Sequence, residues 1–211
     1  MIMPQKSVDL PFVRDFLQQL SSSRCKPIPS WAFTFKVILI GNPGVGKTSL
    51  LLNFAESRLP AEYQPTLGVN IITKVTHIRR DTEIKWIIWD VGCQRRMEHL
   101  RKALYNGAAA VLLVFDKTNP TSLEALETLW LKEIIDAKVN LLEIPVIVVA
   151  NKVDLATQDA TLIDTARTFT HRKKIHFIET SALTGKNVGA LFEYISLQCL
   201  PDSLKSVISI L

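Results

Sequence analysis

The sequence predicts an α/β fold built on a six-stranded, mostly parallel sheet with one antiparallel strand and with helices on both faces. Three observations lead to this prediction. Short runs rich in Val, Ile and Leu alternate with longer amphipathic stretches. A glycine-rich loop, Gly41 to Thr48, stands between an apolar run and a stretch that can form a helix. The turn from Arg80 to Thr82 leaves little room for a helix between two strand-like runs, so these two runs should pair antiparallel.

The first half of the predicted domain contains five elements. The apolar run at 34–40 predicts a strand, and the apolar stretch at 47–57, directly after the glycine-rich loop, predicts a helix. The two runs at 69–79 and 83–90 predict the antiparallel pair of strands. An amphipathic stretch then predicts a helix at 95–106.

The second half alternates strands with helices, which is typical of parallel strands joined by crossover helices. The expected elements are a strand at 109–116, a helix at 120–138, a strand at 145–150, a helix at 160–171, a strand at 174–180 and a helix at 187–199. Ligands of such sheets bind outside the carboxyl ends of the strands. Every candidate motif falls on a loop at one of these ends.

The length and composition predict a single globular domain. The chain has 211 residues, of which 47% are hydrophobic and 21% charged, enough for one sizeable core. We expect the domain at 34–200, an N-terminal extension at 1–33 and a short apolar tail at 201–211. For the tail, folding back on the domain is favoured over insertion into a membrane. The extension should contain an amphipathic helix and a proline-containing linker. That helix could pack on the domain, dock on a membrane surface or bind a partner.

Charge and cysteine content narrow the class of protein. The net charge of +5 comes from basic clusters scattered along the chain, so no nucleic-acid partner is expected. The three cysteines, Cys25, Cys93 and Cys199, match no metal or redox spacing, which favours a reducing compartment. Without a secretory signal or a long apolar run, we expect a cytoplasmic protein. We also expect a monomer. The ends of the sequence suggest no lipid anchor.

The glycine-rich loop has the pattern of a phosphate-binding loop. Its glycines let backbone N–H groups surround phosphate oxygens, Lys47 can reach the β- and γ-phosphates, and the Thr48 hydroxyl can coordinate Mg²⁺. The residues expected at the nucleotide here are Asn42, Pro43, Gly44, Val45, Gly46, Lys47, Thr48 and Ser49.

Two later loops favour guanine as the base. In Asn151-Lys152-Val153-Asp154, the Asp154 carboxylate can accept two hydrogen bonds from guanine, which adenine cannot offer. A site built for such bonds rejects the analogue that lacks the donors by on the order of 10⁴. Ser181, Ala182 and Leu183 follow the next predicted strand and can contribute N–H and hydroxyl groups to the same pocket.

The order of these motifs, together with Pro65-Thr66 and Asp90 to Gln94, resembles the Ras superfamily of small GTPases, and the segments Thr66 to Val69 and Trp89-Asp90 resemble its Rab branch. The resemblance covers about residues 34 to 199. It implies the P-loop NTPase fold of small GTPases and a GTP/GDP switch that acts in signalling or trafficking. It also implies effector, exchange and activating proteins that bind through two mobile loops.

The resemblance assigns roles to single residues. It implies Mg²⁺ bound by Thr48 and Thr66, with Asp90 reaching the metal through water, and attacking water oriented by Gln94. The implied catalytic residues are Gln94, Lys47 and Thr66. Beyond the phosphate loop, the implied nucleotide contacts are Tyr63, Pro65, Thr66, Cys93, Asn151, Lys152, Asp154, Ser181, Ala182 and Leu183.

Several positions depart from the family pattern. Cys93 and Pro43 stand where glycine or a small residue is usual, and Leu59 stands where an aromatic residue usually stacks on guanine. Arg95 and Arg96 replace residues that are often acidic, which suggests different regulatory partners. Since Gln64 stands two residues before Thr66, no arginine in cis is evident there.

Three functions are compatible with this pattern. The first is a switch that hydrolyses GTP slowly and needs an activating partner. The second is a GTP-binding interaction module with little or no hydrolysis, which Pro43 and Cys93 favour. The third, an ATP-dependent P-loop enzyme, is disfavoured by Asp154.

Overall fold

The computed structural model of the chain describes residues 31–57, 66–78, 82–94, 98–140, 143–155, 161–202 and 205. The sheet and its helices lie in one compact unit, Trp31–Cys199. Some expectations fall outside the described residues: the N-terminal helix and linker, most of the apolar tail, and the residues Leu59, Tyr63, Gln64, Pro65, Arg95 and Arg96.

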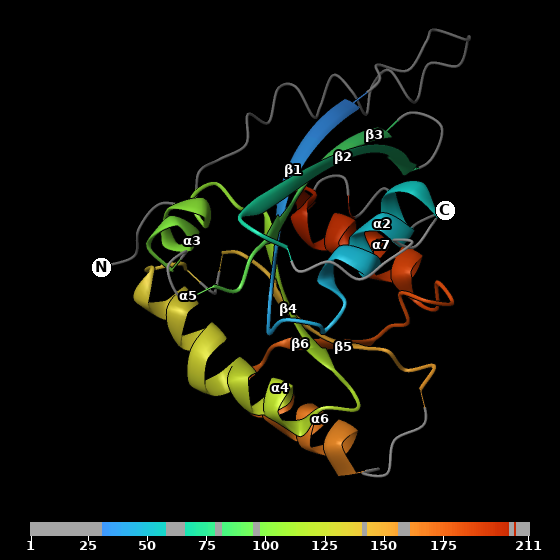
Figure 1. Ribbon diagram of the computed structural model, residues 1–211. Coiled ribbons are helices and arrows are strands. Elements are labelled where there is room, and N and C mark those ends of the chain that lie inside the picture. Colours follow the sequence, from blue (N-terminus) through green and yellow to red (C-terminus); the bar gives the residue numbers. More distant parts are fainter. Residues whose placement is uncertain are drawn as a thin grey trace, which may run out of the picture. The chain divides into compact units, whose positions relative to one another are not determined.

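The six predicted strands form one sheet in the order β2-β3-β1-β4-β5-β6 (Figure 1). Only β2 and β3 pair antiparallel; the other neighbours are parallel. The fold class and the predicted antiparallel pair are therefore confirmed. The strands are β1 Trp31–Ile40, β2 Val69–Ile78, β3 Thr82–Val91, β4 Ala110–Asp116, β5 Val146–Asn151 and β6 His176–Glu179.

The helices lie on both faces of the sheet, as predicted. They are α2 Lys47–Glu56, α3 Glu98–Leu104, α4 Pro120–Ala125, α5 Lys132–Asp136, α6 Thr161–Lys173 and α7 Val188–Cys199. Figure 1 shows α2 and α7 on one side of the sheet and α3, α4, α5 and α6 on the other. Among the described residues, no helix combines the length and apolar character needed to cross a bilayer.

One predicted helix contains an irregular turn. The stretch expected as a single helix at 120–138 runs from α4 into a π-helical segment, Leu126–Leu131, and then into α5. Asn119 begins this helix, because its side chain accepts a hydrogen bond from the Thr121 amide. π-Helical turns are rare and often lie at functional sites.

Two strands begin more than one residue away from the predicted start, and the other described strand boundaries agree with the prediction within one residue. β1 begins at Trp31 rather than at 34, because its pairing with β3 already starts opposite Thr82. β6 begins at His176 rather than at 174. Lys174 has a φ of 55°, and the amides of Lys174 and Ile175 bond back to the last turn of α6, so these residues end the helix instead of starting the strand.

Alternate strand residues fill two apolar layers. Ile38 and Ile40 of β1 belong to the buried cluster beneath α3 to α6, together with Trp130. On the other face, Phe54 of α2 stacks on Phe192 of α7 with ring centroids 3.5 Å apart, and Trp86 meets both rings edge-on. This aromatic packing fixes α2, and hence the loop before it, on the sheet.

Candidate nucleotide-binding site

The glycine-rich loop connects β1 to α2 in very little space. Gly41 and Gly46 have φ values of 148° and 93°. A Cβ on Gly41 would lie 2.1 Å from the Val114 carbonyl oxygen, and one on Gly46 would lie 2.3 Å from the Asn151 amide nitrogen. Larger residues would clash with β4 and with the Asn151 side chain at the end of β5. Pro43 and Gly44 are exposed at the tip of the loop, and Ser49 is half-buried in α2.

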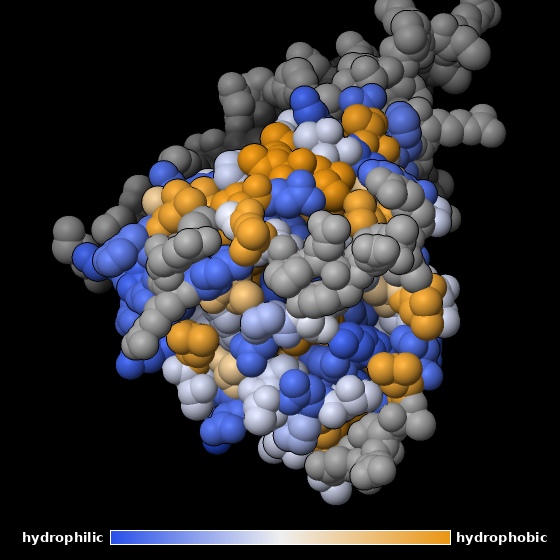
Figure 2. Space-filling model, viewed as in Figure 1, coloured by the Kyte–Doolittle hydropathy of each residue, from blue (hydrophilic) through white to orange (hydrophobic). Residues whose placement is uncertain are grey.

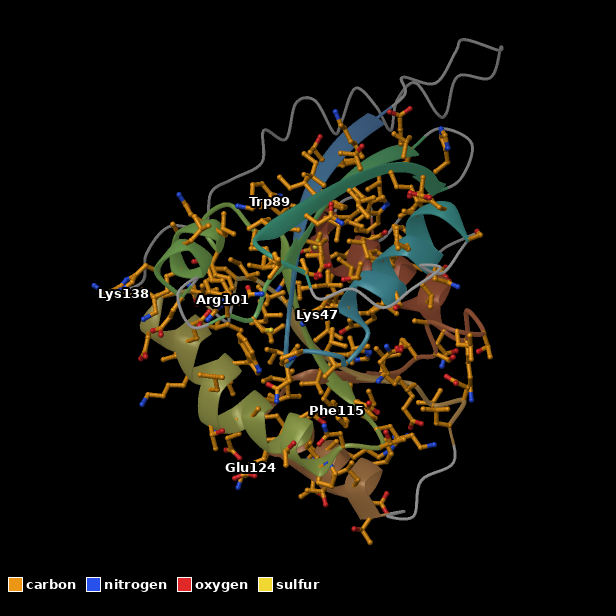
Figure 3. The ribbon with its side chains drawn as sticks, viewed as in Figure 1. Lys47, Trp89, Arg101, Phe115, Glu124 and Lys138 are labelled. Carbon is orange, nitrogen blue, oxygen red and sulfur yellow. The ribbon has the colours of Figure 1, made fainter. Side chains whose placement is uncertain are left out.

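Lys47 is held by its own loop. Its side chain is 7% exposed, and Nζ donates to the carbonyl oxygens of Gly41 at 2.8 Å and Asn42 at 2.9 Å. Burial lowers the pKa of Lys47, and the nearby Asp90 carboxylate opposes that shift. The ammonium is thus pre-positioned beside the first two residues of the loop; Figure 3 labels Lys47 in this region.

The three side chains predicted to bind Mg²⁺ meet at one place. Thr48 Oγ1 donates to Asp90 Oδ2, Thr66 Oγ1 lies 3.2 Å from the same oxygen, and the two hydroxyl oxygens are 2.9 Å apart. Asp90 is fully buried, and its Oδ1 has no hydrogen-bond partner among the described residues. A buried carboxylate oxygen without a donor beside two hydroxyls is an oxygen-only ligand set of the kind Mg²⁺ prefers. The residues present therefore fit this metal.

The segment Gly92–Gln94 lies against the loop that carries Thr66. The Gly92 amide donates to the Gly68 carbonyl oxygen at 2.7 Å, and Gln94 Nε2 donates to the Thr66 carbonyl oxygen at 2.8 Å. Gln94 Oε1 is buried and finds no partner within the described part of the chain. Cys93 is half-buried and packs against the core. The structure thus brings Gln94 next to the Thr48, Thr66 and Asp90 group.

Asn151 joins the phosphate loop to the two base loops. It is fully buried; Nδ2 donates to the Val45 carbonyl oxygen at 2.9 Å, and Oδ1 accepts from the Ala182 amide at 3.1 Å and from Thr180 Oγ1 at 3.2 Å. Because β5 and β6 are adjacent, the loops that follow them meet at the same sheet edge.

The remaining predicted base-contacting residues lie on these two loops. Ser181 Oγ donates to Asp154 Oδ1 at 2.5 Å, so the two loops are directly connected. Asp154 and Leu183 are exposed, whereas Ala182 is buried. An exposed Asp154 that already accepts one hydrogen bond keeps a second carboxylate oxygen for further donors.

Lys152 has a partner that the sequence interpretation missed. Its Nζ lies 2.7 Å from Asp116 Oδ2, and Asp116 Oδ1 accepts from the Thr118 amide and hydroxyl at 2.8 and 2.7 Å. Burial acts to raise the pKa of Asp116, but Lys152 and Thr118 more than offset it, so the pKa lies below its ordinary value. The available signal was a carboxylate directly after a buried apolar run, at the edge where the other motifs lie.

Trp130 also escaped the sequence interpretation, because it stands in a stretch expected as regular helix. Its indole Nε1 donates to Asn42 Oδ1 at 2.8 Å across 88 residues of sequence. Hence the first residue after Gly41 in the phosphate loop is bonded to the π-helical segment.

Comparisons with known proteins agree with this geometry. The model of the Ras family matches residues 36–200. The Ras-related protein RABA2a of Arabidopsis thaliana is 36% identical over 170 residues, which cover 81% of this chain and 76% of the relative. The Ras-related protein YPTC6 of Chlamydomonas reinhardtii is 38% identical over 170 residues, covering 81% and 77% respectively. RABA1e of Arabidopsis thaliana is 36% identical over 167 residues, covering 79% and 75%.

Proposed function

The chain belongs to the Ras family of small GTPases, and from this we propose that it is a guanine-nucleotide switch. It binds GTP or GDP with Mg²⁺ and hydrolyses GTP slowly to GDP and phosphate. Loss of the γ-phosphate changes the loops that carry Thr66 and Gln94, and with them the binding of effector proteins.

The observation that carries this proposal is the meeting of Thr48, Thr66 and Asp90, with Asp90 Oδ1 buried and unpartnered among the described residues. Thr48 lies in the first turn of α2 and Thr66 lies on the loop before β2, so a γ-phosphate and metal at this point would tie the two segments together. These three residues would hold Mg²⁺, which when bound would neutralise charge on the phosphate oxygens.

The chain's own residues divide the catalytic work. The Lys47 ammonium, fixed by two loop carbonyl oxygens, stabilises negative charge on the β- and γ-phosphates. Gln94 is held through Nε2, which leaves Oε1 to accept a hydrogen bond from the attacking water. The buried Arg101 guanidinium is bonded to Glu133, so it does not serve as a catalytic arginine. We therefore propose a slow intrinsic rate and a need for an activating partner.

Base selection rests on Asp154. One of its carboxylate oxygens accepts from Ser181, and Asn151 connects the loop that carries Ser181 to the phosphate loop through its hydrogen bonds with Ala182 and Val45. We propose that Asp154 accepts from guanine N1–H and the 2-amino group, with Ser181, Ala182 and Leu183 at the guanine carbonyl and the Lys152 stem along the base.

The partner surface lies beside the loop that carries Thr66. Leu67, Ile71 and Val75 are 75%, 48% and 48% exposed, and Figure 2 shows apolar atoms gathered over β2 and β3. Exposed apolar patches of this kind mark binding sites for other proteins. We propose that effector, exchange and activating proteins dock there, that the protein acts as a monomer in the cytoplasm, and that the N-terminal extension provides any membrane contact.

Calorimetric titration with GDP and ADP tests nucleotide binding. Asp154→Ala should weaken GDP binding by about a hundredfold or more, because two hydrogen bonds to a charged acceptor are worth about 3 kcal/mol or more together. ADP binding should stay weak in both proteins. Asp164→Ala, at an exposed position of α6, is the matched control. Equal affinities for GDP and ADP in the wild type would rule out the proposed base pocket.

A second candidate function is an interaction module that binds GTP with little hydrolysis, favoured by the half-buried Cys93 in the segment that must move. Single-turnover GTP hydrolysis separates the two functions. We expect Gln94→Leu to lower the rate at least about tenfold, with the exposed Gln198→Leu as control. Equal rates near background for wild type and Gln94→Leu would favour the module.

A further inference from the structure

A buried charged cluster lies between α3 and the long helix α4–α5. We call Arg101, Tyr105, Trp130 and Glu133 the Arg101 cluster. Arg101 and Glu133 are 3% and 4% exposed, and Figure 3 shows Arg101 between α3 and α5. Arg101 Nε donates to Glu133 Oε1 at 2.8 Å and Nη2 donates to Oε2 at 2.6 Å, so the pair is bidentate.

The rest of the cluster fixes this ion pair in place. The Tyr105 hydroxyl donates to Glu133 Oε1 at 2.9 Å, and the Trp130 ring lies 5.1 Å from the guanidinium carbon. Burying two charges costs several kcal/mol per ion unless their remaining donors and acceptors are satisfied. Here both carboxylate oxygens have donors, and the guanidinium has further acceptors.

Those further acceptors belong to the segment that carries Gln94. Arg101 Nη1 donates to the Gly92 carbonyl oxygen at 3.1 Å and to the Gln94 carbonyl oxygen at 2.9 Å, the carbonyls on either side of Cys93. Two carbonyl groups that point at one nitrogen constrain the backbone between them. A lysine could not replace this arrangement, because a single ammonium does not reproduce a planar fork of donors.

The long helix α4–α5 also contacts the phosphate loop. Trp130 Nε1 donates to Asn42 Oδ1 while its ring lies over the Arg101 guanidinium. The phosphate loop is therefore bonded to the π-helical segment through Trp130, and Gly92–Gln94 is linked to the first turn of α5 through Arg101 and Glu133.

We propose that Arg101 is a positioning residue for Gln94. Its guanidinium is fixed by Glu133, which Tyr105 in turn holds. In this way it holds the backbone of Gly92–Gln94 so that the Gln94 side chain stays against the Thr66 carbonyl oxygen. The role of Gln94 in hydrolysis rests on the proposed function. The restraint of Gly92–Gln94 by Arg101 is independent of the proposed function.

Hydrogen exchange of the full-length protein as purified tests the holding of the segment. Arg101→Lys should raise amide exchange across Gly92–Gln94 roughly tenfold, because lost hydrogen bonds lower the free energy of local opening. Arg167→Lys is the matched control, because Arg167, on the far helix α6, is exposed and forms an ion pair with Glu179 of β6. Unchanged exchange at Gly92–Gln94 would overturn the proposal, and so would a rise spread evenly over the sheet and α6.

A milder variant keeps the test decisive if Arg101→Lys does not fold. Tyr105→Phe removes only the hydroxyl that donates to Glu133. It should raise exchange in the same segment by roughly threefold and leave α6 and β6 unchanged. No local rise in this variant counts against the proposal.

A double-mutant cycle in single-turnover hydrolysis separates positioning from general destabilisation. Arg101→Lys should slow hydrolysis about tenfold in the wild-type background and have no further effect in Gln94→Leu. GDP dissociation should change less than about twofold. An additive loss in the Gln94→Leu background would overturn the positioning role. If the wild type hydrolyses no GTP, the proposed function fails, and hydrogen exchange still decides whether Arg101 holds the segment.

Discussion

Replacing Asn151 by alanine should lower the free energy of unfolding much more than a substitution at an exposed position does. The Asn151 side chain is fully buried and makes three hydrogen bonds, to Val45, Thr180 and Ala182. These partners lie in two separate loops, the phosphate loop and the loop after β6. Alanine leaves the Val45 carbonyl oxygen and the Ala182 amide without this partner in a buried position.

The expected loss follows from these two backbone groups. An unsatisfied buried donor or acceptor costs about 1–3 kcal/mol, so the pair together costs about 2–6 kcal/mol, with a central value of about 4 kcal/mol. The free energy of unfolding of a domain is typically about 5–15 kcal/mol. The substitution should therefore remove a large fraction of the stability.

Urea unfolding followed by tryptophan fluorescence measures this loss, because Trp86 is only 1% exposed in the folded protein. Asn70→Ala is a matched control, since Asn70 is exposed on β2. It should change the free energy of unfolding by about 0.5 kcal/mol or less. The reasoning is refuted if Asn151→Ala costs less than about 1 kcal/mol or no more than the control.

Two further predictions concern residues that the sequence interpretation missed. Because the pKa of Asp116 is lowered in the folded protein, its stabilisation is present above the ordinary aspartate pKa and is lost as pH falls through the lowered value. Asp116→Asn should thus show a weaker dependence of unfolding free energy on pH below about pH 4, and equal slopes in urea titrations would contradict this. Trp130→Phe keeps a ring over Arg101 but loses the donor to Asn42, so it should cost about 1 kcal/mol in unfolding free energy. An unchanged urea midpoint would show that this hydrogen bond contributes nothing.

The sheet could be predicted because its signals are local. β4 and β5 are buried along their whole length. Their unbroken apolar runs are typical of strands at the centre of a parallel sheet, which are buried on both faces. The short Arg80–Thr82 turn admitted only an antiparallel pair. The motif residues then had to meet, because the carboxyl ends of parallel strands share one edge.

What could not be predicted depends on contacts between distant residues. Lys174 carries no glycine-like signal for its left-handed φ, so the end of α6 and the start of β6 were misplaced. The π-helical segment has the same amphipathic pattern as a regular helix. This segment contains Trp130, whose partners Asn42 and Arg101 lie far away in sequence. Nothing in the sequence distinguishes Asp116 from other charged residues at strand ends. Its role becomes clear only from its ion pair with Lys152 in the structure.

The Arg101–Glu133 pair is better explained by the donors it supplies than by the stability it adds. A buried ion pair gains little over a well-packed apolar pair of similar volume, since desolvation cancels most of the attraction. An apolar pair, however, could not satisfy the carbonyl oxygens of Gly92 and Gln94. Gly92–Gln94 lies outside the helices and strands, so its carbonyl groups need donors from side chains or from water. Water molecules at these carbonyl groups would exchange between alternative positions. A guanidinium that is bonded to Glu133 on its other side permits only one arrangement of the Gly92–Gln94 backbone. A residue that orients Gln94 must have this property.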